Sequence, residues 1–405
     1  MLPQAYRRVL ALPRVRTTIL MMFVARLPMT AMGILMTLHV VHTLGKGYAE
    51  AGLVGTATTI GGALGAPAVG RMIDRFGLRR VVAVCGLCST LYWVGVPHLP
   101  YLVLVVFAAP AGLLAVPANS LTRQFLTALV PEDQRRAVFT LDTILAETSF
   151  IFGPALIVFV TTQLSSAVAL TGIGCCIGLT SLALWITNLP VRTAEEAAPG
   201  EQVARPRMRT WLDGRLVAAL LISVGALFTL IGTELALIAG MGASGETSWT
   251  GVVFAMMSIA SILGGFVHGA VRKSLSQALL AGLLGLLVVP VGLVDHPWWL
   301  LGIALIPMNL MCTPTLAACA ETVSRLAPAR VRGEAMGLQD SATRLGIALG
   351  NPVVGFVIDN ASHVWGFAAA GLGGLVLTGA GVLCQRRSGA TDRPQTPATE
   401  AEVPA

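Results

Sequence analysis

Residues 51–80 read AGLVGTATTIGGALGAPAVG followed by RMIDRFGLRR, and the contrast between these two segments decides the fold. The first segment carries no charged side chain, whereas the second is strongly basic. A helix needs about 20 mostly apolar residues to cross a bilayer. We therefore expect residues 50–70 to form a transmembrane helix and the following residues to form a loop at the membrane surface.

The composition extends this expectation to the rest of the chain. The 405 residues are 55% hydrophobic and 12% charged, with a mean hydropathy of +0.77. Soluble domains carry about 25% charged residues, so this composition excludes a water-soluble enzyme. The apolar runs are continuous rather than alternating, which also argues against a transmembrane β-barrel.

Twelve apolar stretches are long enough to span a membrane. In hydrocarbon every backbone polar group needs an internal partner, so each stretch is expected to be helical. The sequence predicts an all-α membrane protein with twelve transmembrane helices, at residues 17–43, 50–70, 81–97, 101–122, 138–162, 167–187, 216–240, 250–270, 277–294, 298–321, 335–359 and 365–384.

The cationic residues gather on one side of this arrangement. If the N-terminus is cytoplasmic and the loops alternate sides, 24 of the 27 Lys and Arg residues fall in cytoplasmic segments. Arg123 is counted among them, as an anchor at the cytoplasmic end of span four. Both termini are therefore expected in the cytoplasm. Arginine outnumbers lysine 25 to 2, as is typical of GC-rich bacterial genomes, so we expect a multi-pass protein of a bacterial inner (plasma) membrane.

Two hydrophilic segments divide the chain. Residues 188–215 are rich in charge, Pro and Ala, and we interpret them as a cytoplasmic linker with a short surface helix. The end of the chain has the composition of disorder. We expect a six-helix bundle over residues 1–187, the linker over 188–215, a second six-helix bundle over 216–385 and a disordered cytoplasmic tail over 386–405.

The two halves are related in sequence. A shift of 197 residues aligns three prolines and an arginine of the first half with the same residue types in the second, namely Pro110 with Pro307, Pro117 with Pro314, Pro131 with Pro328, and Arg135 with Arg332. A shift of 199 residues aligns Gly52, Gly65 and Gly70 with Gly251, Gly264 and Gly269. A repeat of six spans is typical of transporter folds, which bind substrate between the halves at mid-membrane.

The loop after span two carries a family signature, Gly70-Arg-Met-Ile-Asp74-Arg75-Phe-Gly77-Leu-Arg79-Arg80. It resembles the motif of the major facilitator superfamily, and the span count, linker and repeat resemble the twelve-span efflux members of that family. The resemblance implies that Asp74 faces the N-terminus of span eleven, where the helix dipole favours a carboxylate. It also implies that this contact holds one conformation closed on the inside. The alternative is a basic loop that only obeys the positive-inside rule.

Span five contains Gly153-Pro154, which resembles the Gly-Pro core of a motif found in the superfamily's antiporters. The paired glycines that usually follow are absent, because the run continues as Ala155-Leu-Ile-Val. This motif favours an exporter, and the alternative is an ordinary proline kink.

Arg26, Glu147 and Arg344 each stand nine residues after the start of their span. At 1.5 Å per residue they lie roughly 14 Å deep, where an unpaired charge costs at least about 2.5–3.5 kcal/mol. The resemblance implies that spans one and five are neighbours, so we expect Arg26 to pair with Glu147. A proton on Glu147 would break this pair during the cycle, and Asp142 is a further candidate for proton coupling. The alternative is a permanent salt bridge that only fixes helix packing.

Other polar residues of the spans are candidates for the substrate cavity. Arg344, with Asp340 one turn earlier, is suited to hold an anionic or polar part of a substrate. Asn309 and Thr313 share a face of span ten and have side chains that hydrogen-bond either a substrate or another helix. Glu234, in the outer half of span seven, either lines the cavity or reaches its aqueous edge.

These patterns predict a secondary active transporter, and no enzyme, that moves a small organic solute across the plasma membrane by alternating access. Proton-coupled efflux is the preferred mode, and no phosphate-cradling loop for ATP is present. The alternatives are an importer or facilitator for a sugar or metabolite, and a non-transporting sensor or assembly protein of the same fold. We expect a monomer whose partners are the solute, protons and the lipid bilayer, with no nucleic acid, cofactor or metal.

Overall fold

The structure is a computed structural model of the chain. It describes residues 4–12, 14–191, 208–271, 275–294 and 297–391, and within these residues it is helical, with no β-strand. The N-terminal half consists of α1 (Gln4–Ala11), α2 (Val15–Leu38), α3 (Tyr48–Phe76), α4 (Leu78–Gly95), α5 (Tyr101–Leu113), α6 (Ala118–Leu129), α7 (Arg135–Gln163) and α8 (Ser166–Thr187).

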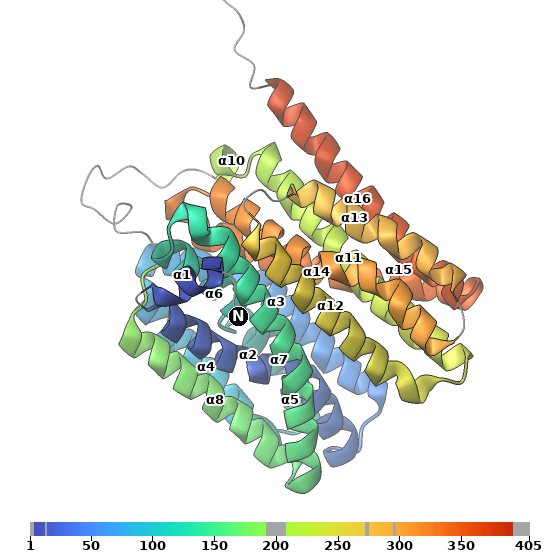
Figure 1. The fold of residues 1–405 in the computed structure, drawn as a ribbon. Coiled ribbons are helices and arrows are strands. Elements are labelled where there is room, and N and C mark those ends of the chain that lie inside the picture. The colour runs from blue at the N-terminus through green and yellow to red at the C-terminus, as the bar shows by residue number, and fades with distance from the viewer. Residues whose placement is uncertain (1–3, 13, 192–207, 272–274, 295–296, 392–405) are drawn as a thin grey trace, which may run out of the picture.

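The second half follows the linker. It consists of α10 (Met208–Trp211), α11 (Gly214–Ala243), α12 (Thr250–Ala270), α13 (Gln277–Val288), α14 (Trp298–Leu326), α15 (Arg332–Asn360) and α16 (His363–Thr391). Figure 1 shows the blue-to-green helices of the first half packed beside the yellow-to-red helices of the second.

Ten helical segments of the described chain are long and apolar enough to cross a membrane. The apolar segment Gln277–Leu293 is shorter, and α7, with 29 residues, supplies one more helix of spanning length. These segments follow the order of the twelve expected spans. The all-α membrane fold predicted from the sequence is confirmed.

Span four differs from the continuous helix expected over residues 101–122. The helix stops at Leu113 and restarts at Ala118. Pro117 explains the break, because it lacks an N–H donor and disfavours a helical conformation at the residue before it. The equivalent helix α14 runs unbroken through Pro307 and Pro314. The aligned prolines therefore have different effects in the two halves.

The structure describes part of the linker and part of the tail. In the linker, α10 is a short helix whose Met208 and Thr210 are exposed and whose Trp211 is buried in an apolar cluster with Leu216 and Val323, so it packs on the surface of the second half. Helix α16 continues to Thr391 and therefore enters the segment 386–405 that the sequence predicts to be disordered. Residues 192–207 and 392–405 lie outside the described residues.

The sequence repeat is visible in a single contact between the halves. The hydroxyl oxygens of Thr127 in α6 and Ser324 in α14 lie 2.8 Å apart, and the two residues are separated by 197 positions. This is the shift that aligns the prolines of the two halves. A residue that contacts its own counterpart lies on the axis that relates the repeats. The pseudo-two-fold axis therefore passes between α6 and α14.

Candidate functional site

The loop between α3 and α4 joins the halves through Asp74. Its carboxylate accepts a hydrogen bond of 3.1 Å from the backbone N–H of Glu334. Glu334 lies in the first turn of α15, so the carboxylate faces the positive end of that helix dipole. Gly77, with φ of +83°, then turns the chain into α4. The contact expected between Asp74 and the start of span eleven is present, and its gating role stays a prediction.

Glycine allows this close approach of α3 and α15. A Cβ atom on Gly70 would overlap the backbone of Gly333, so the two helices touch backbone to backbone there. About two turns before Gly70 in α3, the carbonyl of Ala63 accepts a hydrogen bond from the hydroxyl of Ser341 in α15. The two halves are thus held together along this pair of helices.

The basic residues of the same loop stay on the first half. Arg79 donates from Nε to the carbonyl of Trp185 at 3.0 Å, and Arg75 lies with its guanidinium 5.0 Å from the ring centre of Phe76. Arg80 is exposed. Asp74 is therefore the side chain of this signature that the described contacts place across the boundary between the halves.

Contacts on the opposite side of the axis involve α7. Arg136 lies 3.8 Å from Glu321 of α14 and donates to the carbonyl of Val271 at the end of α12, at 3.1 Å. Like Asp74 and Thr127, these residues lie at the end of the molecule that carries the arginine-rich loops. The positive-inside rule predicts that this end faces the cytoplasm. The protein is therefore closed at its arginine-rich end.

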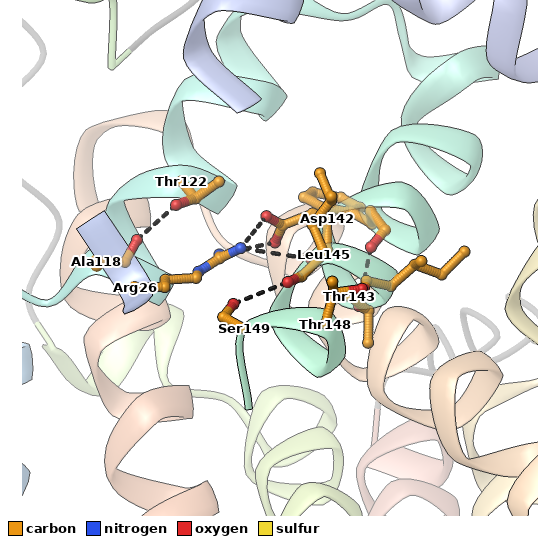
Figure 2. Close-up of polar contacts among 10 residues, drawn as sticks. Arg26, Ala118, Thr122, Asp142, Thr143, Leu145, Thr148 and Ser149 are labelled. Atoms are coloured by element: carbon orange, nitrogen blue, oxygen red, sulfur yellow. Dashed lines mark hydrogen bonds and ion pairs between the residues drawn. The ribbon is translucent and has the colours of Figure 1, made fainter. Parts of the chain in front are cut away.

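A buried ion pair joins α2 to α7 (Figure 2). Nη1 and Nη2 of Arg26 donate to the two carboxylate oxygens of Asp142 at 2.6 and 3.1 Å, and both side chains are nearly inaccessible to solvent. The pair predicted between Arg26 and Glu147 is therefore wrong, since Arg26 uses Asp142 instead.

Helix geometry explains this correction. Thr30 donates to the carbonyl of Ser149, which places Arg26 at about the depth of residue 145 on α7. Helical side chains lean toward the N-terminus of their helix, so the long Arg26 side chain reaches the earlier carboxylate. Asp142 and Glu147 are five residues apart, about 140° around the helix. Only one of them can face α2.

Arg123 extends the charges toward the second half. It interacts electrostatically with Asp142 of α7 and also with Asp340 of α15. Arg123 is therefore more than an anchor at the membrane surface, because it interacts with a carboxylate of each half. The sequence does contain a signal for this. Residues 118–129 include several polar side chains that lipid would not accept, among them the buried Ser120, Thr122, Gln124 and Thr127.

Arg344 forms an ion pair with Asp340 one turn away, with Nε 3.0 Å from a carboxylate oxygen. Asp340 is buried, whereas 38% of the Arg344 side chain is exposed. The guanidinium lies against Gly62 of α3, where an added Cβ would be 3.5 Å from Cζ. Charges of alternating sign therefore run across the boundary between the halves, in the order Arg26, Asp142, Arg123, Asp340, Arg344.

Glu147 of α7 and Glu234 of α11 form a second group of charges between the halves. Both side chains are partly exposed, and the two carboxylates are close enough to interact electrostatically. Within the part of the chain that the structure describes, neither makes a hydrogen bond or an ion pair. The site thus has one set of charges in which each carboxylate interacts with arginines, and one pair of carboxylates without a cationic partner in the described chain.

Asn309 and Thr313 take part in helix packing. Asn309 donates to the carbonyl of Leu305 in its own helix, and the hydroxyl of Thr313 lies 2.8 Å from that of Ser261 in α12. Both residues are buried. Of the two alternatives left open by the sequence, bonding between helices fits Thr313, whereas Asn309 bonds within its own helix.

Gly153 belongs to the contact between α2 and α7. A Cβ there would overlap the Thr30 hydroxyl and the carbonyl of Leu27, so the glycine lets the two helices meet closely. Helix α7 continues through Pro154 to Gln163. The Gly153-Pro154 pair therefore positions the helix that carries both Asp142 and Glu147.

Comparison with protein families identifies the fold. The model of the Major Facilitator Superfamily matches residues 18–294 and 242–405, which together cover almost the whole chain. A search of curated proteins by sequence gives no significant match.

Solved structures give the same result. The chain is similar to a bacterial homologue of the iron transporter ferroportin in an outward-facing state, with a TM-score of 0.74 and 13% identity over 92% of this chain and 100% of that one. It is similar to the human organic anion transporter MFSD10, with a TM-score of 0.71 and 16% identity over 93% and 99%. It is also similar to the proton:xylose symporter XylE, with a TM-score of 0.67 and 12% identity over 90% and 94%. Identities this low speak for the fold alone.

Proposed function

The chain belongs to the major facilitator superfamily, and from this premise we propose that it is a proton-coupled secondary transporter that exports a small organic solute by alternating access. The observation that carries the proposal is the set of charges at the boundary between the halves. Charges buried inside transmembrane bundles are expensive and mark substrate and proton pathways.

The alternating charges supply a link between conformation and binding. Arg123 belongs to the first half and Asp340 to the second, so any rocking of the halves changes the distance between them. Arg344 is bound to Asp340 and is itself partly exposed, which suits it to hold an anionic or polar group of the solute. A solute bound there would replace interactions that the halves make with each other.

Glu147 and Glu234 supply the proton site. Two carboxylates without a cationic partner in the described chain repel each other, and a proton shared between them relieves this repulsion. Because one carboxylate lies on each half, protonation would alter the balance between the open and closed arrangements. Export is favoured over import by Gly153-Pro154 in α7, which resembles the core of the antiporter motif.

The first experiment identifies a solute. Growth and compound accumulation would be compared in cells with and without the protein, across a panel that includes organic anions and sugars. Uptake of each candidate compound into everted membrane vesicles would then be measured under an imposed pH gradient. Accumulation of a panel compound that collapses when the gradient is dissipated is the expected result. Flux that ignores the gradient would refute proton coupling and favour a facilitator.

The variant Glu147→Gln tests the proton site. Glutamine keeps the size and hydrogen bonding of the side chain but releases no proton. We expect gradient-driven flux to fall at least tenfold while exchange of labelled for unlabelled solute continues, because exchange needs no net proton movement. Glu132→Gln, at an exposed position in the turn just before α7, is the matched control. Normal gradient-driven flux in Glu147→Gln would remove Glu147 from the coupling role.

A further inference from the structure

The first helix of the chain, α1, lies outside the membrane spans and touches both halves. Tyr6 is completely buried, and its hydroxyl donates to the carbonyls of Gly265 and Phe266 on α12, at 2.9 and 3.2 Å. The Tyr6 and Phe266 rings meet edge to face with their centres 5.5 Å apart. A residue at the start of the first half is thus fixed to a helix of the second.

The seat of Tyr6 is shaped for an aromatic ring. A Cβ on Gly269 would overlap the Tyr6 hydroxyl, so this glycine leaves the space that the side chain fills. One turn along α1, Val9 is also fully buried, in an apolar cluster that includes Val138 of α7 and Ala317 of α14. Burial raises the pKa of Tyr6 to about 12, so the hydroxyl stays a donor throughout the physiological pH range.

The sequence repeat relates the Tyr6–Gly269 contact to the contact that Gly70 and Asp74 make with α15. Under the shift of 199 residues, Gly70 corresponds to Gly269 and Asp74 corresponds to Lys273. On the α3–α15 side, the backbone of Gly333 packs over Gly70 and Asp74 accepts from the start of α15. On the other side, the sequence has a lysine where a carboxylate would be needed, and Tyr6 packs over Gly269 instead.

We propose that α1 is a latch, in which Tyr6 clamps α12 to the first half and stabilises the state that is closed at the cytoplasmic end. The inference rests on the proposed alternating-access cycle. When the cytoplasmic ends of the halves separate, the Tyr6 hydroxyl must leave the two carbonyls and its ring must leave the seat at Gly269. The latch therefore opposes opening on the pseudo-symmetric side, where the sequence has Lys273 in place of a carboxylate.

Distances between spin labels test the latch without any substrate. Labels would be placed at Asp133 and Arg325, exposed positions at the cytoplasmic ends of opposite halves, in a variant that lacks the seven native cysteines. We expect Tyr6→Phe to raise the ratio of open to closed molecules about fivefold, as the loss of one hydrogen bond of ordinary net strength implies. Tyr6→Ala and Gly269→Ala should raise it further, because they also empty or block the seat.

Tyr101→Phe is the matched control. It also removes a tyrosine hydroxyl that donates to a backbone carbonyl, that of Glu50 at 3.2 Å, but both residues belong to the first half. We expect its distance distribution to match that of the parent. Unchanged distributions in both Tyr6 variants would overturn the latch. Asp74→Asn, measured in parallel, separates the two proposals. If only Asp74→Asn opens the protein, the latch is refuted but the proposed alternating access is not. If no variant opens the protein, the result counts against the proposed function as well.

Discussion

At the scale of single residues, the sequence predicts that Arg26 pairs with a carboxylate of α7, but it does not identify that carboxylate as Asp142. The bond from Thr30 to Ser149 places Arg26 level with about residue 145 of α7. The sequence offers two carboxylates at nearly that depth, Asp142 and Glu147. Which of them faces α2 depends on the rotation of α7 about its axis. Side-chain packing along the whole helix sets this rotation, and local spacing does not reveal it.

The same pair gives a prediction about stability. Asp142→Asn or Arg26→Gln alone leaves the other charge buried without its partner, a change that costs about 3–5 kcal/mol in comparable pairs. The double variant Arg26→Gln/Asp142→Asn removes both charges. We therefore expect each single variant to lower the midpoint of thermal unfolding in detergent more than the double variant does.

Asp133→Asn, in an exposed loop, controls for loss of a carboxylate as such. A double variant that is less stable than both single variants would contradict this expectation. The reason would then lie in Arg123, which interacts with Asp142 and would lose that carboxylate in the double variant.

At the scale of elements, glycines decide which helices approach closely. The sequence contains 44 glycines, so their abundance alone says nothing about individual contacts. The family signature singles out Gly70, and the structure places it against Gly333 at the crossing of α3 and α15. The break in span four follows from Pro117, yet α14 tolerates equivalent prolines. A local sequence rule therefore predicts where a helix may break, and the packing around it decides whether it does.

Gly70→Ala should loosen the α3–α15 crossing. The added methyl group overlaps the backbone of Gly333, which pushes the helices apart and draws Asp74 away from the Glu334 N–H. We expect the spin-label distances at the cytoplasmic end to shift toward the open state. Gly55→Ala, on the same helix, is the control, because an added Cβ there meets nothing within 4 Å. A Gly70→Ala protein with the parent's distance distribution would contradict the proposed role of the crossing.

At the scale of the whole molecule, the sequence predicts the architecture well. Hydropathy gives the spans and aligned prolines give the repeat, while the orientation drawn from the arginines stays a prediction. It does not reveal the charge array, because that array is assembled from α2, α6, α7 and α15, which are distant in sequence. Arg123 illustrates the difficulty. Its place along span four predicts a side chain at the membrane surface, whereas its partners, Asp142 and Asp340, lie on α7 and α15.

The axis contact predicts a way to lock the protein. Thr127→Cys/Ser324→Cys, in a background without native cysteines, places two thiols where the hydroxyls lie 2.8 Å apart. Oxidation should trap the state closed at the cytoplasmic end and abolish net flux in the vesicle assay. A reductant should restore the flux, and each single cysteine variant should be insensitive to both treatments. Undiminished flux in the fully cross-linked protein would show that the halves do not separate between α6 and α14.

The chemistry of this contact bears on ancestry. In a dimer of two identical six-helix units, a residue on the two-fold axis would meet an identical copy of itself. A lysine or an aspartate would then face its own charge, whereas a hydroxyl can donate in one copy and accept in the other. Thr127 and Ser324 have this self-complementary character although they are no longer the same residue. Once two copies are fused into one chain, each position is free to diverge. At this position the divergence has kept the one property that such a dimer would have required.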